Sequence, residues 1–351
     1  MGLLRYLLAI AVVIDHSGGI RYSTLITGTL PVQAFFLISG FYMSMILAEK
    51  YNSFSLFITN RLLRLLPVYW IFLFLISVTA KYVDGIVIPN DQLSFSTRLI
   101  VWASNLFIVG QDIFMFLGLD PKSGSFYFTD NFRENGTPYA SSFLAMPQAW
   151  SVSLEIFFYL LAPFIFKKSL KVVITIFVLS ILTRLILARN GLSLDPWVYR
   201  FLPNELAVFC CGYFAYRIYK SNFLKKLDCT LNKGFISVLF ICLTLTIGPI
   251  ERIYGGYSAV AYLMLLTLCL PFLFSFSKNS TFDRLVGELS YPIYLCHLFV
   301  LFLLQRYAYY EGNVAVLNVL ISTLISYIVI KTVSDSIEKY RQSRVRLKIQ
   351  G

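Results

Sequence analysis

Long apolar runs recur from one end of the chain to the other, and they leave few choices of fold. Hydrophobic residues make up 58% of the sequence and charged residues only 14%, which is too little polar surface for a soluble protein. Runs of this length predict helices in a bilayer, and we expect an all-α, polytopic transmembrane bundle. The apolar segments are approximately 3–19, 29–48, 62–80, 99–118, 149–166, 169–187, 203–219, 234–250, 257–277, 286–306 and 313–334.

Clusters of Lys and Arg predict how these segments thread through the membrane. Four connections carry an excess of basic residues, the last of them at the C-terminal end, and such connections stay on the cytoplasmic side. Simple alternation satisfies all four only if segment 99–118, which contains Asn105, Gln111 and Asp112, does not cross. We therefore expect about 10 spanning helices, one re-entrant or interfacial helix, and both termini in the cytoplasm.

The net charge of +12 has a plain use in such a protein. Basic residues at the ends of spans orient a membrane protein and contact lipid headgroups, so we expect contact with membrane lipid and none with nucleic acid. No linker or repeat divides the chain. We expect one transmembrane domain over residues 1–338 and a basic cytoplasmic tail over 339–351.

Cysteine and histidine are too sparse for a metal centre. The six cysteines show no Cys-x2-Cys spacing, and the chain has only two histidines, His16 and His297. We expect no metal site, with the cysteines as small apolar residues within helices. Both histidines lie in or at the end of an apolar segment, which makes each a candidate functional residue.

The first apolar segment carries ionisable residues at both ends. On a helix, the eleven residues from Arg5 to His16 advance about three turns, so both side chains lie on one face, about 16 Å apart along the axis. Ionisable groups at membrane depth normally face a protein interior or a water-filled cavity. The spacing predicts a helix that lines an intramembrane reaction chamber. Alternatively, Asp15 and His16 are a polar pair at a helix end that faces water.

Arg61 and Arg64 lie three residues apart at the cytoplasmic start of a predicted span, and so on one face of it. Two guanidinium groups there suit the binding of phosphate or pyrophosphate by charge-assisted bonds. The alternative is that they only set topology or contact lipid headgroups.

Two further motifs place polar residues inside apolar runs. Glu155 lies within WSVSLEIFFY and suits a general acid or base, or else forms a structural ion pair with Arg5 or Arg184. His297 ends the stretch SYPIYLCH, where it is either functional or a residue that hydrogen-bonds two helices together.

Taken together, these motifs resemble acyltransferase family 3, integral membrane proteins that include bacterial O-acyltransferases of surface polysaccharides. The resemblance covers about residues 2–335. The matching stretches, in chain order, are Arg5 with His16 (Arg-x10-His), PVQAFFLISGF at 31–41, Arg61 with Arg64 (Arg-x-x-Arg), WSVSLEIFFY at 150–159 and SYPIYLCH at 290–297.

The resemblance implies an acyl-CoA donor, usually acetyl-CoA, that binds from the cytosol with help from Arg61 and Arg64. It also implies that Arg5 and His16 are essential. The expected acceptor is a carbohydrate or lipid-linked glycan, the expected location is the bacterial inner membrane, and proteins of envelope polysaccharide assembly are expected partners.

We assign roles on this basis. His16 is the expected general base toward a sugar hydroxyl, Glu155 orients or charges a reacting group, and Arg5 completes the catalytic set. A covalent acyl-enzyme on Ser or His and direct transfer both remain open. The residues expected to contact substrate or support the site are Asp15, Trp150, Ser153, Tyr159, Tyr291 and His297.

Three other functions account for part of the pattern. A transporter or flippase without acyl-transfer chemistry explains the spans and the intramembrane charges, but not two arginines at a cytosolic entrance together with His16 on the Arg5 face. A structural partner in an envelope complex predicts that His16 and Glu155 are dispensable. A different class of His-dependent membrane acyltransferase fits the positions of the motifs less well.

Overall fold

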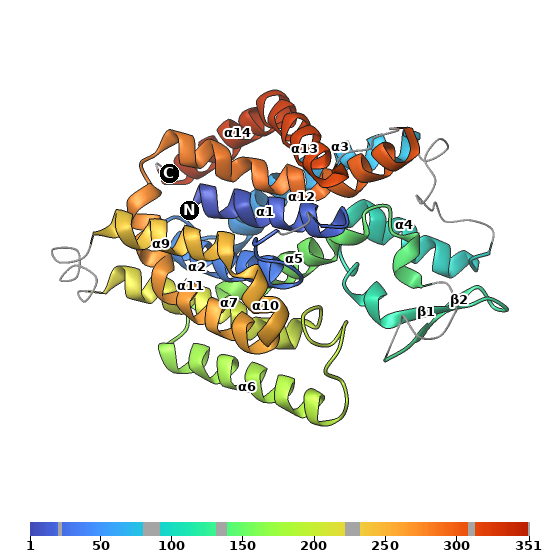
Figure 1. Ribbon diagram of the computed structural model, residues 1–351, viewed down its shortest axis with the longest axis horizontal. Helices are drawn as coiled ribbons and strands as arrows, with labels where there is room; N and C mark the ends of the chain where they lie inside the picture. The colour runs from blue at the N-terminus through green and yellow to red at the C-terminus, as the bar shows by residue number, and fades with distance from the viewer. Residues whose placement is uncertain (20–22, 80–91, 131–138, 222–231, 308–312, 350–351) are drawn as a thin grey trace.

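The computed structural model describes residues 1–19, 23–79, 92–130, 139–221, 232–307 and 313–349 (Figure 1). Helices dominate the described ranges, and the N-terminus lies on the side of the bundle away from a short β-hairpin (Figure 1). The elements are α1 (Gly2–His16), α2 (Leu30–Glu49), α3 (Phe54–Thr79), α4 (Phe95–Phe107), the 3-10 turn Ile113–Phe116, β1 (Leu117–Asp120), β2 (Ser125–Phe128), the 3-10 turns Ala140–Phe143 and Pro147–Ala149, α5 (Trp150–Phe166), α6 (Leu170–Arg189), α7 (Leu202–Lys220), α9 (Lys233–Thr246), α10 (Gly248–Tyr254), α11 (Gly256–Ser277), α12 (Thr281–Tyr307), α13 (Val314–Val329), the π-helical turn Ile330–Ser334 and α14 (Asp335–Ile349).

The helical membrane fold is confirmed. Within the described ranges, seven helices are long and apolar enough to cross a bilayer, and the number rises to eight if α9 and α10, bent by 58°, form one broken span. Helix α1, with 15 residues, and α7 are not among the seven, so the expected total of about 10 spans stays a prediction. The seven are Leu30–Glu49, Phe54–Thr79, Pro147–Phe166, Leu170–Arg189, Gly256–Ser277, Thr281–Tyr307 and Val314–Val345.

Segment 99–118 does not form one continuous helix. Helix α4 has 13 residues, about 20 Å of rise against a hydrocarbon core of about 30 Å, and it ends at Ile108 in a left-handed conformation. Two of the polar residues that argued against a membrane span here, Asn105 and Gln111, form hydrogen bonds that hold the surrounding segments. The Asn105 side chain accepts a hydrogen bond from Ala145 N at 2.7 Å, and Gln111 Nε2 donates to Tyr69 Oη at 3.1 Å.

A short antiparallel hairpin follows α4. The all-α prediction did not include this hairpin. Strands β1 and β2 pair with Leu117 opposite Phe128 and Asp120 opposite Ser125. Asp120 stabilises the turn, since its carboxylate accepts hydrogen bonds from Lys122 N and Ser123 Oγ. The hairpin lies beyond one end of the bundle (Figure 1).

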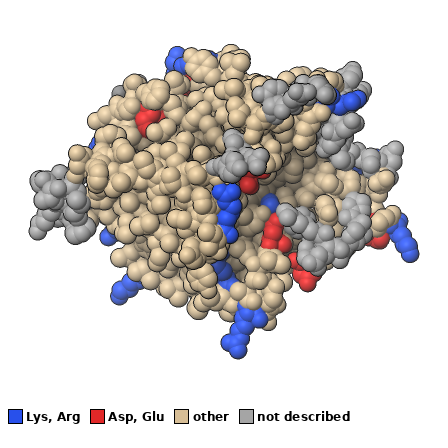
Figure 2. Space-filling model, viewed as in Figure 1, with Lys and Arg blue, Asp and Glu red and all other residues tan. Residues whose placement is uncertain are grey.

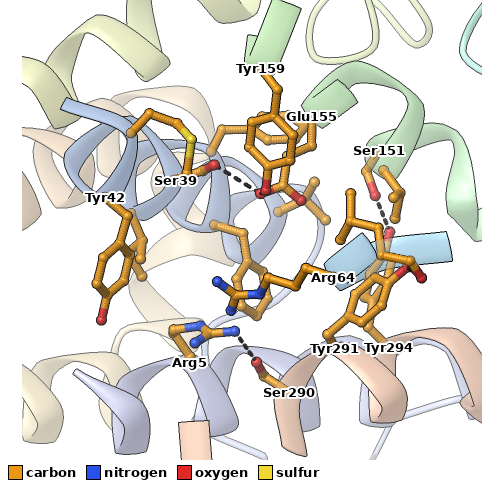
Figure 3. A pocket seen from close by; sticks show the side chains of 17 residues that line it. Arg5, Ser39, Tyr42, Arg64, Ser151, Glu155, Tyr159, Ser290, Tyr291 and Tyr294 are labelled. Carbon is orange, nitrogen blue, oxygen red and sulfur yellow. Dashed lines mark hydrogen bonds between the residues drawn. The ribbon is translucent and has the colours of Figure 1, made fainter. Parts of the chain in front are cut away.

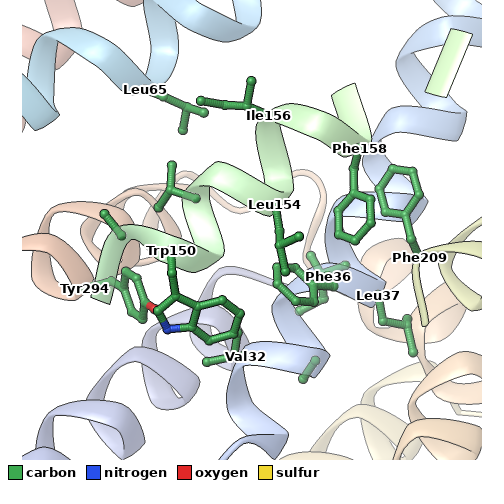
Figure 4. Close-up of a cluster of buried hydrophobic side chains, with 14 of the residues drawn as sticks. Val32, Phe36, Leu37, Leu65, Trp150, Leu154, Ile156, Phe158, Phe209 and Tyr294 are labelled. Carbon is green, nitrogen blue, oxygen red and sulfur yellow. The ribbon is translucent and has the colours of Figure 1, made fainter. Parts of the chain in front are cut away.

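Helices α2 and α7 pack closely against each other through glycines. A Cβ added at Gly40 would lie 2.1 Å from Phe209 O, and one at Gly212 would lie 2.1 Å from Leu37 O. Small residues of this kind let membrane helices approach through their backbones. The apolar core continues from this pair to α5, where Phe158 stacks on Phe209 with ring centroids 4.6 Å apart (Figure 4).

Helix α6 lies at the margin of the bundle (Figure 1), and most of its side chains are not buried, in contrast to α2 and α7. Leu185 and Ile186 are each 60% exposed, as expected for side chains that face lipid tails. Figure 2 shows a surface that is mostly uncharged on the face in view, which is consistent with a bilayer as solvent.

The predicted domain boundary between 338 and 339 falls inside a helix. Helix α14 runs unbroken from Asp335 to Ile349 and packs against α3. Residues after 338 therefore continue the fold as far as the structure describes them.

Candidate functional site

Helix α1 lies against α12 along its length and presents both ends of the Arg-x10-His motif to it (Figure 1). Gly2 and Gly287 allow this contact, because a Cβ on Gly287 would lie 2.6 Å from Gly2 Cα. At one end, Arg5 Nη2 donates to Ser290 Oγ at 2.9 Å. At the other end, His16 meets His297. The predicted common face of Arg5 and His16 is therefore the face that contacts α12.

His16 and His297 form a hydrogen-bonded pair. The distance from His16 Nδ1 to His297 Nε2 is 2.8 Å, and the ring planes differ by only 6°. The ring centroids are 5.0 Å apart, which fits two imidazoles joined edge to edge in nearly one plane rather than stacked face to face. His297 is fully buried, whereas His16 is exposed.

The hydrogen bonds assign the neutral tautomers. His297 Nδ1 lies 2.7 Å from Tyr294 O, and a carbonyl oxygen only accepts, so His297 carries its proton on Nδ1. Its Nε2 is then an acceptor, and His16 must donate from Nδ1. This leaves the Nε2 lone pair of His16 free on an exposed ring, as a general base requires.

Asn318 of α13 connects the elements around this pair. Its Nδ2 donates to His297 O at 3.1 Å and to Ser17 Oγ at 2.9 Å, which joins α12 to the end of α1. Ser322 Oγ donates to Asn318 Oδ1 at 2.9 Å and holds the amide in this orientation. Asn318 and Ser322 are fully buried, so this polar network stiffens the His16 end.

Arg5 and Glu155 line a small cavity of about 90 Å³ between α1, α2, α3, α5 and α12 (Figure 3). Arg64 points toward Arg5 in it, and Tyr42 lies beside them (Figure 3). The predicted residues that it brings together are Arg5, Arg64, Glu155, Tyr159 and Tyr291.

Glu155 is held by hydroxyl groups. Ser39 Oγ donates to Glu155 Oε1 at 2.8 Å, and Tyr159 Oη donates to the same oxygen at 2.5 Å. The alternative of an ion pair with Arg184 is wrong, because Arg184 Nη2 contacts Glu205 Oε1 at 2.8 Å instead. A carboxylate in one cavity with Arg5 and Arg64, but bonded to neutral donors, stays available to a ligand.

A second, larger cavity of about 620 Å³ adjoins the first. Arg5, Tyr42, Arg64 and Tyr291 line both, so the two cavities meet at these side chains. Arg61 lines only the larger one, which is also mainly basic: seven Lys or Arg and four Asp or Glu side chains face it. The volume is in the usual range for a ligand site, about 300–1,000 Å³.

Other predicted residues lie outside both cavities. His16 and His297 line neither. Trp150 is buried, and Arg200 Cζ lies 4.3 Å from the centre of its ring (Figure 4 shows Trp150 among apolar neighbours). Asp15 is exposed.

Ser153 has a structural contact rather than a place in either cavity. Its Oγ donates to Asp112 Oδ1 at 2.6 Å and accepts from Gly110 N at 3.0 Å. Burial raises the pKa of Asp112, and the bond from Ser153 partly offsets this shift. Ser153 thereby fixes the loop after α4 to α5.

Several residues of the site carried no signal of their own in the sequence. Ser39 and Ser290 lie inside recognised motifs, but their contacts to Glu155 and Arg5 cross between helices. Tyr42 follows the 31–41 motif directly and faces both cavities. Arg341 was assigned to the basic tail, yet it lines the larger cavity.

The chemistry available here is that of acids, bases and cations. Within the part of the chain that the structure describes, no three His, Cys, Asp or Glu side chains gather as a metal site would need. The arrangement combines a basic cavity, an inner carboxylate and, at the far end of α1, an imidazole with a free lone pair.

Comparison with known proteins finds a matching family model and a relative. A family model described as an acyltransferase domain matches residues 1–333. An uncharacterized protein of Aquifex aeolicus is 26% identical over 207 residues, which cover 58% of this chain and 92% of that protein. No solved structure matches the chain.

Proposed function

This chain belongs to acyltransferase family 3 and is a membrane acyltransferase. We propose that it transfers an acetyl group from cytosolic acetyl-CoA to a hydroxyl of a carbohydrate. The acceptor is a cell-surface glycan or its lipid-linked precursor, and the membrane is the bacterial inner membrane. The single observation that carries this proposal is the arrangement of α1. It places Arg5 in the cavity pair and gives His16 a free Nε2 at its other end.

The basic cavity supports the donor part of the proposal. CoA carries several phosphate groups on its nucleotide and a long, thin arm that ends in the thioester. Arg61 and Arg64 are positioned to hold phosphates, since both line the larger cavity. The arm would enter the smaller cavity past Arg5 and Tyr42, where the two cavities meet.

The histidine pair supports the acceptor part. His16 Nε2 takes the proton of the sugar hydroxyl while that oxygen attacks the thioester carbonyl carbon. The carbon–sulfur bond then breaks, and the sulfur leaves as the free thiol after taking a proton from the imidazolium. His297 accepts from His16 Nδ1 throughout and keeps Nε2 directed outward.

Glu155 and Arg5 act on the donor side. The carboxylate stays fixed by Ser39 and Tyr159, and Arg5 by Ser290. A fixed charge of each sign in a cavity of this size orients the amide-bearing arm of the donor without reorganisation of the protein, and the thioester at the end of that arm extends past the cavity toward His16. Neither residue has to move a proton in this scheme.

The test is a comparison of surface glycans from cells with and without the gene by mass spectrometry. We expect each modified sugar to lose the mass of one acetyl group when the gene is deleted, and to regain it with the wild-type gene but not with His16→Ala. A shift equal to a succinyl or longer group would change the acyl assignment. Unchanged glycans, together with purified protein that does not bind CoA, would reject the proposal.

A further inference from the structure

The C-terminal helix contributes to the larger cavity through one buried arginine. Arg341 of α14 lines that cavity with Arg61 and Arg64 of α3. It is only 8% exposed, and its side chain bonds to Glu338. Its Nε is buried without a hydrogen-bond partner among the described residues, and the same is true of Nε of Arg61, which is 6% exposed. Two buried guanidinium groups thus have unused donors.

The residues next to Arg61 hold α14 in place. Arg344 Nη1 donates to Asn60 Oδ1 at 2.9 Å, and Arg344 Nη2 donates to Thr59 Oγ1 at 2.9 Å. Asn60 is fully buried, and its Nδ2 also contacts Arg341 O at 3.4 Å. Consecutive residues of α3 therefore anchor α14 and supply Arg61, so that Arg341 is set beside the Arg-x-x-Arg motif.

Like charges are not placed together in a buried site without a counter-charge. Bringing three arginines to one cavity is costly unless an anion or a carboxylate neutralises them. Glu338 bonds to Arg341, and no ion pair of Arg61 or Arg64 is formed within the described part of the chain. The unused Nε–H groups and the unpaired cations describe a site for an anion with several charges.

We propose that Arg341, with Arg61 and Arg64, forms a three-arginine site for the phosphate groups of a nucleotide-bearing ligand. The inference rests on the proposed function, because it identifies that ligand with the acyl-CoA donor. It makes α14 part of the donor site, where the sequence suggested only a basic tail. Guanidinium groups fit phosphate oxygens in pairs, which a lysine at the same place cannot reproduce.

The test measures binding of CoA and turnover of two donors by the full-length protein in detergent. We expect Arg341→Gln to weaken CoA binding about tenfold and Arg341→Lys to fall between it and wild type. The ratio of kcat/KM for acetyl-CoA to that for acetyl-pantetheine, which lacks the nucleotide, should fall by a similar factor. Lys339→Gln is the matched control, because Lys339 is exposed on the same helix and outside the cavity.

The outcomes separate this site from the proposed function. Wild-type CoA binding by Arg341→Gln, or an equal loss with both donors, would overturn the three-arginine site while leaving acyl transfer in place. Arginine-dependent CoA binding without any acyl transfer would support the site and reject the function. If Arg341→Gln does not fold, competition on the wild-type protein decides: pyrophosphate should displace CoA, and failure to do so contradicts the proposal.

Discussion

The two ends of α1 contact the same helix, α12, in different surroundings. At the Arg5 end, the contact opens into two adjoining cavities lined by charged side chains. At the His16 end, a fully buried histidine, an asparagine and serines form a closed network, and only His16 itself is exposed. One end offers volume and charged side chains, and the other holds a single ring in one orientation.

In the proposed function, this difference would let one helix serve two substrates. A binding cavity needs volume and unpaired charge, whereas a general base needs one fixed lone pair. These demands conflict if they fall on the same few residues. Eleven residues of helix separate them by about 16 Å, so changes at either end should give different kinetic signatures.

The largest expected effect comes from removing the base. His16→Ala should lower kcat by about 10²- to 10⁴-fold, because the acceptor hydroxyl loses its proton acceptor. CoA binding should stay near wild type, since His16 lines neither cavity. Thermal stability should fall, because the fully buried Nε2 of His297 loses its hydrogen-bond donor. Acyl-transfer assays with purified protein measure the first and calorimetry the second. Acyl transfer that persists in His16→Ala would show that the His16 end of α1 does not supply the general base.

The second-largest effect is expected on CoA binding in the cavities at the Arg5 end of α1. Replacing Arg61 and Arg64 together by Gln should weaken CoA binding about 100-fold, because two charge-assisted contacts to phosphate are lost. Titration with CoA at several salt concentrations should also show a weaker salt dependence than in wild type. Arg217→Gln, which changes a basic residue outside both cavities, is a suitable control. Equal CoA affinity in the double variant and the control would contradict a donor site here.

Substitutions of His297 should affect activity through its hydrogen bond to His16. His297→Ala should lower kcat about tenfold with little change in KM for the donor, because His16 loses the acceptor that sets its tautomer. His297→Gln should recover part of this activity, since its amide oxygen can still accept from Nδ1. A pH–rate profile distinguishes this role from a structural one: it should move in His297→Ala and be partly restored in His297→Gln. Identical profiles in all three proteins would count against the assignment.

The smallest effect is expected at Ser290. Ser290→Ala removes the hydroxyl that accepts from Arg5 and should raise the donor KM about threefold, since water in the cavity can replace it. Activity from His16 should be unaffected at saturating donor. Steady-state kinetics at varied acetyl-CoA concentration measures both values, and a change confined to kcat would show that Arg5 does not act on the donor.

Local spacing made part of this site predictable. The interval from Arg5 to His16 placed both on one face, and the α12 contacts confirm that face. The polar residues in segment 99–118 correctly argued against one continuous crossing helix. These inferences succeeded because helical periodicity and the cost of polar groups in lipid act within one segment.

Contacts between segments were not predictable in this way. His16 and His297 are 281 residues apart, and no spacing rule joins them. Arg184 was a reasonable partner for Glu155 by charge, yet packing pairs it with Glu205. The hairpin of β1 and β2 was missed because its strands are four residues each, too short for a clear alternating pattern.

The π-helical turn Ile330–Ser334 leads from α13 directly into α14. Such a turn takes in one residue more than the α-helical path and absorbs it locally, so the helix continues beyond it. Arg341 therefore lies on the continuation of the helix that carries Asn318, which links the wall of the larger cavity to the support of the histidine pair at the opposite end of α1.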